Sequence, residues 1–150
     1  MEAEKLAVLK NLTEEWIPFN KQLGLEFVEA EDGMARVKFD FRPELVGNAI
    51  MKILHGGVIS ATLDFVGGLA VMSTFVKTGK IYGMGTVDMR VDYLNPGAGK
   101  RFFAQGTVMR SGRILCSTRM ELHNDEDQLI ATGNAVYRVS RKEEAVFMNV

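Results

Sequence analysis

The sequence predicts an α+β fold in which a curved antiparallel sheet of about six strands wraps around one long central helix. Residues 53–76 are apolar on every side when wound as a helix, and Asp64 is the one charged residue between His55 and Lys77. A helix that is hydrophobic all round has to be enclosed. The remaining chain carries six strand patterns separated by turn residues, and together these can cover a single helix.

Before the central helix, we expect an N-terminal helix over about residues 3–17. Leu6, Leu9 and Trp16 recur there at helical spacing, and Pro18 follows. A β-hairpin comes next, with strands 25–30 and 34–41 around a turn at residues 31–33. In its second strand, apolar side chains alternate with charged ones, which indicates one buried face; they are Ala35, Val37, Phe39 and Phe41. Residues 42–52 are expected to form a loop.

The central run is also long enough for a transmembrane span. Four glycines, Asp64 and His55 interrupt it, however, and its flanks carry no aromatic belt or cluster of Lys and Arg. We therefore expect a helix enclosed by the sheet and no membrane partner. Its glycines would let neighbouring backbones approach closely; they are Gly56, Gly57, Gly67 and Gly68. The polar residues 77–80 are expected to end the helix.

Four more strand patterns follow the central helix. In the first, Val87, Met89, Val91 and Tyr93 alternate with polar residues, as on one face of a strand, until residues 95–97 end it. The other three strands are predicted at residues 101–110, 113–123 and 129–139, and residues 141–150 are expected to form a C-terminal tail. One helix within about six antiparallel strands is the hotdog arrangement.

Composition limits the class of protein. The 150 residues fit a single domain, 1–150, and the net charge of −1 shows no electrostatic footprint for nucleic acid. The single cysteine, Cys116, and the absence of a signal-peptide apolar region predict a cytoplasmic protein. Two histidines and one cysteine give no metal-ligand spacing, so no metal and no cofactor are expected.

Asp64 is the first candidate functional residue, because a carboxylate within an apolar helix is costly unless something compensates it. The sequence His55-Gly56-Gly57 at the helix start is the second candidate. Backbone N–H groups at a helix N-terminus lack partners and lie at the positive end of the helix dipole, so they can hold a developing negative charge. A buried Asp satisfied by neighbouring hydroxyls or amides is the structural alternative.

These motifs resemble a known family. HGGVISATLD at residues 55–64, with GTVDMRVDYLNPG at 85–97, resembles the hotdog-fold acyl-CoA thioesterases of the PaaI-like group. PFNKQLGLEF at 18–27 and MELHN at 120–124 are similar to the bacterial YigI-type branch, whose members act on medium- and long-chain acyl-CoA. The resemblance covers nearly the whole chain. It implies hydrolysis of an acyl-CoA thioester to a free fatty acid and coenzyme A.

The resemblance also implies roles for individual residues. Asp64 matches the catalytic carboxylate, Gly56 the oxyanion N–H donor, and His55 the residue that orients this turn. Thr86 matches a Ser or Thr near the attacking water. Asn48 matches a catalytic-loop Asn, although it stands seven residues before the His where several relatives have six. Gly57 is expected to contact the substrate. Residues that match segments in contact with coenzyme A are Tyr93, Asn95, Pro96, Arg110, Ser111, Gly112 and Arg113, and the arginines could pair with phosphates.

Geometry predicts that the site needs two chains. Gly56 and Asp64 are eight residues apart, which is about 12 Å along a helix axis. An oxyanion donor and a base or nucleophile both have to lie about 3 Å from the reacting group. We therefore expect an obligate homodimer in which Gly56 of one chain faces Asp64 of the other. Pairing of dimers into a tetramer stays open.

Two other functions remain as alternatives. One is a hotdog hydratase or dehydratase, which would usually need a His beside the carboxylate, whereas His55 is expected to serve the turn. The other is a non-catalytic acyl-CoA binding or sensor module. Asp64 within the helix favours chemistry over binding alone. Ser60 lacks the G-x-S-x-G elbow of serine hydrolases, and Cys116 fits a small core residue better than a nucleophile.

Overall fold

The computed structural model describes residues 3–75 and 83–140 of the chain. Residues 77–80, expected to end the helix, and the expected tail at 141–150 lie outside the described residues. Helical segments are α1 (Ala3–Asn11), the π-helical turn η1 (Leu12–Trp16), α2 (Pro18–Leu23), the 3-10 turn η2 (Pro43–Leu45) and α3 (Gly56–Phe75). Strands are β1 (Glu26–Glu31), β2 (Met34–Asp40), β3 (Val46–Asn48), β4 (Ile53–Leu54), β5 (Gly83–Tyr93), β6 (Arg101–Ser111), β7 (Leu115–Asn124) and β8 (Leu129–Ser140).

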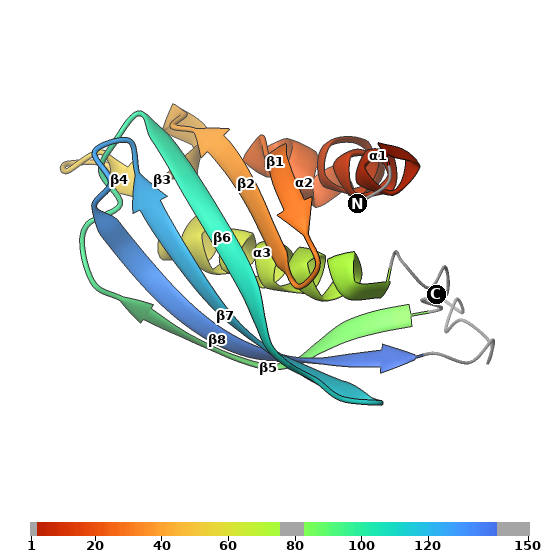
Figure 1. Cartoon of the computed structure of the whole chain (residues 1–150). Helices are drawn as coiled ribbons and strands as arrows, with labels where there is room; N and C mark the ends of the chain where they lie inside the picture. Colours follow the sequence, from red (N-terminus) through yellow and green to blue (C-terminus); the bar gives the residue numbers. More distant parts are fainter. Residues whose placement is uncertain (1–2, 76–82, 141–150) are drawn as a thin grey trace, which may run out of the picture.

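Six strands form one antiparallel sheet in the order β1-β2-β6-β7-β8-β5. The sheet curves around α3, which lies across its inner side (Figure 1). The predicted fold, six antiparallel strands around one long helix, is therefore confirmed. β1 lies at one edge of the sheet and β5 at the other, although β5 follows α3 directly in the sequence.

The core lies between α3 and the inner face of the sheet. Leu63, Val66 and Ala70 of the helix are fully buried. From the strands, Val37 and Leu122 are fully buried and Ala104 is almost fully buried. α3 is long and apolar enough to cross a membrane by composition alone, but most of it is buried inside the protein. Its all-round hydrophobicity is thus explained by the sheet that encloses it.

α3 and β6 approach each other closely at two glycines. A Cβ added to Gly106 of β6 would lie 2.5 Å from the carbonyl oxygen of Val66 and 3.0 Å from the nitrogen of Gly67, both on α3. Because those atoms belong to the backbone, no side chain could move aside for it. Glycine at 106 therefore sets the distance between helix and sheet.

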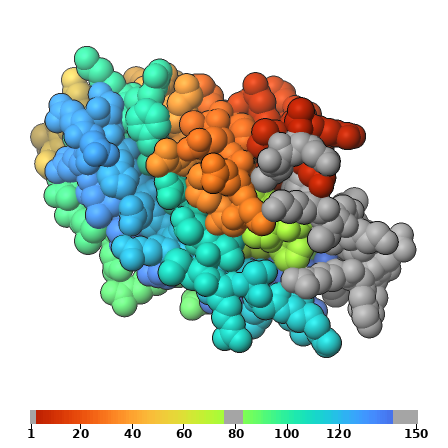
Figure 2. Space-filling view, viewed as in Figure 1, coloured from red at the N-terminus to blue at the C-terminus, as the bar shows by residue number. Residues whose placement is uncertain are grey.

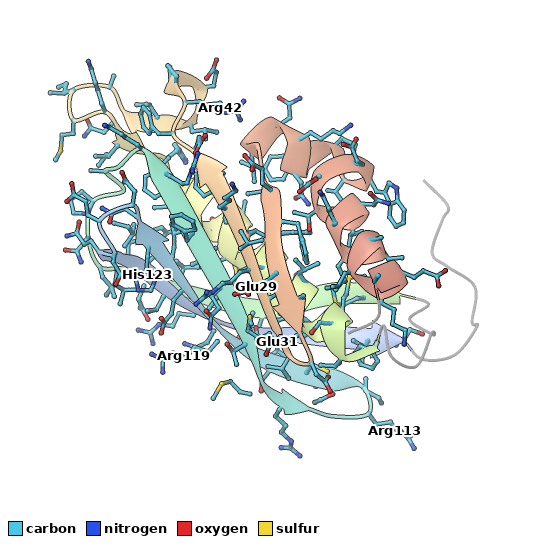
Figure 3. The ribbon with its side chains drawn as sticks, turned by 45° about the horizontal axis from the view of Figure 1, so that its top comes forward. Glu29, Glu31, Arg42, Arg113, Arg119 and His123 are labelled. Atoms are coloured by element: carbon cyan, nitrogen blue, oxygen red, sulfur yellow. The ribbon has the colours of Figure 1, made fainter. Side chains whose placement is uncertain are left out.

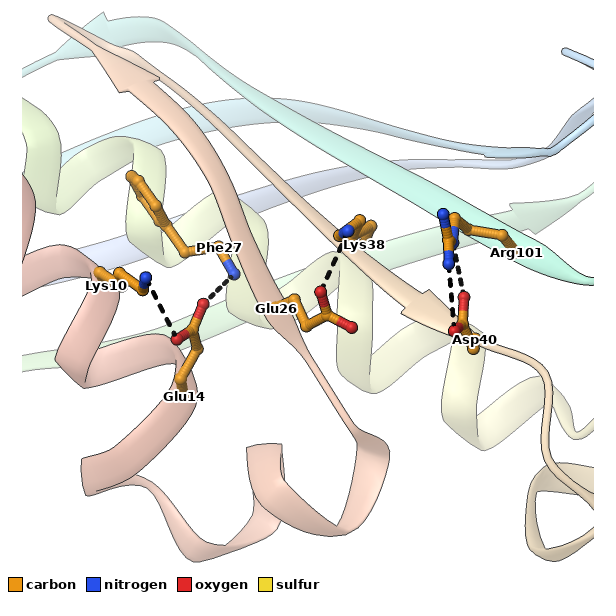
Figure 4. A network of polar contacts seen from close by, with 7 residues as sticks. All are labelled: Lys10, Glu14, Glu26, Phe27, Lys38, Asp40 and Arg101. Carbon is orange, nitrogen blue, oxygen red and sulfur yellow. Dashed lines mark hydrogen bonds and ion pairs between the residues drawn. The ribbon is translucent and has the colours of Figure 1, made fainter.

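The N-terminal segment differs from the single helix expected at residues 3–17. α1 ends at Asn11, the π-helical turn η1 follows, and α2 starts at Pro18. Trp16, expected on the buried face with Leu9, is 58% exposed, because the π-helical turn changes the helical spacing. Glu14 of η1 accepts a hydrogen bond from the Phe27 N–H (2.9 Å) and so ties this segment to β1 (Figure 4).

Figure 4 also shows two ion pairs that join neighbouring strands. Lys38 of β2 lies 3.0 Å from Glu26 of β1, and Arg101 of β6 lies 2.6 Å from Asp40 of β2. The Arg101 guanidinium holds the pKa of the Asp40 carboxyl below its usual value. These pairs are on the surface, where such contacts contribute little to stability.

The segment before α3 also differs from the sequence prediction. The loop expected at residues 42–52 contains η2 and a small ribbon, in which β3 pairs with β4 directly before α3.

The covering of α3 is uneven. On the face shown in Figure 2, the N-terminal segment and the β1–β2 hairpin cover most of α3, and only a small part of the helix is visible. The helix side toward β5 is less enclosed, since Ala61, Phe65 and Met72 are only partly buried.

Candidate active site

Asp64 lies in the middle of α3, half-buried, on the side of the helix that faces the edge strand β5. The Thr86 hydroxyl of β5 donates a hydrogen bond to Asp64 Oδ1 at 2.8 Å. The Tyr137 hydroxyl of β8 lies 2.6 Å from the carbonyl oxygen of Asp64 and 3.2 Å from Oδ1. The carboxylate is therefore compensated by two hydroxyls and sits at the open edge of the sheet.

A β-bulge in β5 brings Thr86 to this position. Thr86 pairs with Tyr137 of β8, whereas Asp88 pairs with the next residue, Val136, so that Val87 is left over. Thr86 and Met89 are three residues apart, so in a regular strand without a bulge they would point to opposite faces of the sheet. The bulge lets both face α3, as bulges near functional sites often do.

The bulge also overturns one prediction. The alternating pattern placed Val87 on the same face of the strand as Met89, Val91 and Tyr93. Val87 is instead 59% exposed, because it is the inserted residue of the bulge. Strict alternation therefore holds only on the far side of the bulge, where Met89 and Val91 are partly buried against the core.

The start of α3 forms the second part of the site. His55 precedes the helix, and its Nδ1 accepts a hydrogen bond from the Gly57 N–H at 2.8 Å, while its carbonyl oxygen accepts one from the Val58 N–H at 3.0 Å. His55 is thus the N-cap of α3. With Nδ1 accepting, the neutral ring carries its proton on Nε2.

Gly56 is the first residue of α3, and its N–H has no intrahelical acceptor. Among the residues that the structure describes, none accepts a hydrogen bond from it. The Tyr93 hydroxyl donates to the Gly56 carbonyl oxygen at 3.1 Å, and the Tyr93 ring packs against the Gly56 Cα side. The helix start therefore presents one backbone donor that is free to bind a ligand.

The turn before α3 is fixed by backbone contacts from two loops. The His55 N–H donates to the Leu45 carbonyl oxygen (2.8 Å), and the Leu54 N–H donates to that of Gly97 (3.0 Å). A Cβ at Gly47 would lie 2.5 Å from the His55 Cα, so the β3–β4 ribbon can pass here only with glycine. This packing holds His55 and Gly56 in place.

Asn48 belongs to the same ribbon and is exposed. Its Oδ1 accepts hydrogen bonds from the backbone N–H groups of Ile50 (3.1 Å) and Met51 (3.0 Å) and closes the turn between β3 and β4. Ile50, at the tip of this turn, is 94% exposed.

The residues matched to coenzyme A contacts fall into two groups at opposite ends of the sheet. Tyr93, Asn95 and Pro96 lie at the end of β5, near Gly56, where the Asn95 amide donates to the Leu129 carbonyl oxygen at 2.8 Å. The other group is the β6–β7 hairpin: Arg110, Ser111, Gly112 and Arg113. Figure 3 shows Arg113 at the tip of this hairpin, far from Arg42 at the other end of the sheet.

The β6–β7 hairpin group is in register, across the sheet, with the two residues whose hydroxyls contact Asp64. Ser111 pairs with Cys116, Cys116 with Tyr137, and Tyr137 with Thr86 across four neighbouring strands. Cys116 is fully buried, as expected for a core residue. One chain thus places Asp64 near its hairpin group, and Gly56 near its Tyr93 group.

Tyr137 was not singled out from the sequence. Its strand alternation with Ala135 and Val139 predicts an inward side chain, and a buried tyrosine hydroxyl needs a hydrogen-bond partner. That combination was the available signal. Burial, and then the neighbouring Asp64 charge, raise the pKa of Tyr137 well above its usual value, so the hydroxyl remains a donor at neutral pH. No cluster of His, Cys, Asp or Glu in the described part of the chain could hold a metal ion.

The fold and these two half-sites define the class of the protein as a hotdog-fold protein with a carboxylate and a helix N-terminus as its chemical groups. A family model described as "Thioesterase superfamily" matches residues 51–131. The chain belongs to this superfamily, and the protein is a thioesterase.

Curated relatives and solved structures agree with this assignment. The medium/long-chain acyl-CoA thioesterase YigI of Escherichia coli K12 is 41% identical over 133 residues, covering 82% of this chain and 86% of that protein. A Shewanella oneidensis structure related to the thioesterase superfamily has a TM-score of 0.86 at 37% identity, over 92% of this chain and 97% of the other. The Escherichia coli PaaI structure shares the fold, with a TM-score of 0.79 at 19% identity, over 92% and 95% of the chains.

Proposed function

We propose that this protein hydrolyses acyl-CoA thioesters to a free fatty acid and coenzyme A, with medium or long acyl chains favoured. The observation that carries the proposal is the Asp64 carboxylate, held by the Thr86 hydroxyl at the open edge of the sheet. The similarity to YigI, which is named for medium- and long-chain acyl-CoA, supports the substrate class. The one cysteine, buried as Cys116, fits a reducing compartment, and we place the protein in the cytoplasm.

In this proposal the thioester carbonyl oxygen accepts a hydrogen bond from the Gly56 N–H, which stabilises the negative charge that develops on that oxygen. Asp64 then acts in one of two ways. It removes a proton from a water that attacks the carbonyl carbon, or it attacks that carbon itself and forms a mixed anhydride, which water later hydrolyses. In both routes the carbon–sulfur bond breaks and coenzyme A leaves as the thiol.

Gly56 and Asp64 of one chain cannot meet at the same thioester, because about 12 Å of helix separates them. The edge strand β5 suggests how a second copy completes the site. Its outer edge is unpaired in the described chain, and Tyr93 near its end is 54% exposed. An unpaired edge with exposed apolar residues is a template for pairing with another strand.

Antiparallel pairing of β5 with its own copy places residues symmetrically about a two-fold axis. Thr86 is close to Asp64, and Tyr93 is close to Gly56. An axis near Met89 therefore brings the Thr86 region of one chain to the Tyr93 region of the other. We propose this homodimer, with two equivalent sites that each combine Asp64 of one chain with Gly56 of its partner.

The same symmetry joins the two groups of residues matched to coenzyme A. The hairpin that carries Arg110 and Arg113 lies at the Asp64 end of one chain, and Asn95 lies at the Gly56 end of the other. Each composite site would then have both groups beside it. Both arginines are exposed, and arginine is well suited to bind phosphate groups in two-point contacts.

The first test measures thiol release over a panel of acyl-CoA substrates of increasing chain length, for the wild type and Asp64→Asn. We expect turnover by the wild type and a loss on the order of 10²- to 10⁴-fold in the variant, since general base catalysis contributes about that much. Retention of acyl-CoA without thiol release by both proteins would instead identify a binding module. Analysis of the acyl product distinguishes the two reactions, because hydrolysis yields an unchanged fatty acid whereas hydration adds a hydroxyl group to an enoyl chain.

The second test mixes two inactive variants, Asp64→Asn and Gly56→Pro, the latter lacking the backbone N–H. If each site combines two chains, every mixed dimer holds one intact site, and random mixing restores about a quarter of wild-type activity. If Asp64 and Gly56 of one chain act together, mixing restores nothing. Subunits are exchanged by partial unfolding and refolding before the assay, with each variant refolded alone as the control.

A third test distinguishes the two roles of Asp64. Single-turnover hydrolysis is run in ¹⁸O water, and the peptide that contains Asp64 is then weighed by mass spectrometry. Label in the Asp64 carboxylate indicates the anhydride route, because water attacks one of its two carbonyl carbons. Label found in the fatty acid alone excludes an anhydride opened at the Asp64 carbonyl carbon and leaves attack of water on the acyl carbon in either route.

A further inference from the structure

Tyr137 contacts Asp64 at two points. The hydroxyl oxygen lies 2.6 Å from the main-chain carbonyl oxygen of Asp64 and 3.2 Å from its Oδ1. One hydroxyl proton is shared between these acceptors, and the shorter contact fixes the phenol to α3. The side chain is 1% exposed and is among the largest fully buried side chains of the protein.

The two hydroxyls near Asp64 converge on the same carboxylate oxygen. Thr86 donates to Oδ1 from β5, and Tyr137 approaches Oδ1 from β8. Within residues 3–75 and 83–140, no donor is bonded to Oδ2. Among the described residues, the carboxylate therefore has one oxygen engaged by hydroxyl donors and one oxygen without a donor.

We propose that Tyr137 is a positioning residue: together with Thr86 it engages Oδ1 and fixes the carboxylate plane, so that Oδ2 is the oxygen that meets the water or the thioester carbon. This inference rests on the proposed function, in which Asp64 does the chemistry. Tyr137 itself does not touch the substrate. Its effect passes through Asp64.

The space for the Tyr137 ring is provided by two glycines of α3. A Cβ at Gly67 would lie 2.5 Å from the Tyr137 hydroxyl, and one at Gly68 would lie 3.5 Å from its Cε1. Any larger side chain at 67 would therefore displace the hydroxyl from Asp64. Gly67 and Gly68, which are predicted to allow close approach of backbones, also leave the space that the Tyr137 ring occupies.

The protonation state of Tyr137 agrees with its role as a donor. Burial and the adjacent Asp64 charge raise the pKa of Tyr137, so the hydroxyl keeps its proton at every pH at which the enzyme is expected to work. The other titratable group in the same inner row is Cys116 of β7, since Asp88 and Asp92 of β5 pair with outward-facing positions of β8.

The test is Tyr137→Phe, which keeps the ring and removes the hydroxyl. We expect kcat to fall about tenfold with KM within twofold of wild type, because one hydrogen bond to a charged group is lost. The acid limb of the pH–rate profile should move to higher pH, since a hydrogen-bond donor to the ionised carboxylate is missing. A merely structural role would lower the melting temperature and leave this limb unchanged.

The matched control is Thr13→Val, which deletes another fully buried hydroxyl, bonded to the Leu9 carbonyl oxygen at 2.8 Å and without contact to Asp64. This variant should lose stability but keep the kcat and the acid limb of the wild type. Gly67→Ala provides a second route if Tyr137→Phe folds poorly. It retains the hydroxyl but displaces it, and it should reproduce the kinetic signature of Tyr137→Phe.

A readout that needs no activity separates this inference from the proposed function. Three-bond couplings of the Asp64 β-protons should report one χ1 rotamer in the wild type and rotamer averaging in Tyr137→Phe. The inference is overturned if kcat, acid limb and couplings all stay at wild-type values in both Tyr137→Phe and Gly67→Ala. If wild-type protein releases no thiol, the proposed function fails, and the couplings alone decide the role of Tyr137.

Discussion

The beginning and the middle of α3 present chemically opposite groups, a hydrogen-bond donor and a carboxylate. At the beginning, Gly56 presents a backbone N–H without an acceptor, and at the middle, Asp64 presents an acidic side chain with donors on one of its oxygens. The beginning is exposed and is fixed from outside by the Tyr93 hydroxyl, whereas the middle is half-buried and is fixed from within by Tyr137. One region offers charge stabilisation and the other offers a reactive carboxylate. Neither is a complete site by itself.

The largest loss of activity is expected when the backbone N–H donor at the start of α3 is removed. Gly56→Pro deletes the N–H at the first helical position, where proline is best tolerated, so α3 should still form. We expect kcat to fall on the order of 10²- to 10³-fold, as for other lost oxyanion donors.

Gly56→Ala is the control for this change, since it keeps the N–H. Its Cβ would lie 3.4 Å from the Tyr93 ring, a tight contact that a small shift relieves. Its kcat should stay within a few-fold of the wild type in the same thiol-release assay. Equal losses in both variants would show that shape, and not the N–H, matters at residue 56.

Removing the Thr86 hydroxyl tests the middle of the helix. Thr86→Val deletes the 2.8 Å hydrogen bond to Asp64 Oδ1 but keeps a β-branched side chain in the strand. We expect a loss of about 10- to 100-fold in kcat, the range for a hydrogen bond to a charged group. Thr74→Val, which removes a hydroxyl bonded to the Val71 carbonyl oxygen instead, should leave kcat unchanged. An unchanged kcat in Thr86→Val would contradict the role given to this threonine.

The smallest effect is expected where the helix start is supported indirectly. Tyr93→Phe removes the 3.1 Å hydrogen bond to the Gly56 carbonyl oxygen and keeps the ring against the turn. One neutral hydrogen bond predicts a loss of about fivefold in kcat/KM. Steady-state kinetics with one acyl-CoA would measure it, and a loss as large as that of Gly56→Pro would mean that Tyr93 contacts substrate directly.

Much of the fold could be predicted because its two periods are clean. The apolar run of α3 requires a helix enclosed by other elements, and the alternation in β2 has one solution for which face is buried; both are found in the structure. The N-terminal segment was harder. Leu9 is buried and Trp16 is exposed, because a π-helical turn changes the spacing and leaves no distinct mark in the sequence.

The candidate site was predictable only in part, for a similar reason. Asp64 and Gly56 stand out locally, one as a charge in an apolar run and the other as a glycine at a helix start. Tyr137 depends on pairing between strands that are distant in the sequence, and no local pattern reveals that it meets Asp64. Val87 was wrongly placed on the same strand face as Met89, because periodicity alone does not locate a bulge.

The bulge at Val87 has a consequence for how this enzyme tolerates change. The side chain of Val87 points to solvent, so many residues would be acceptable there. What has to be kept is the bulge itself, since two residues between Thr86 and Met89 in a regular strand would put these two side chains on opposite faces of the sheet. In this strand, the position of the bulge is under tighter constraint than the chemical identity of residue 87, and an engineer who recombines thioesterases should align β5 by its bulge before its letters.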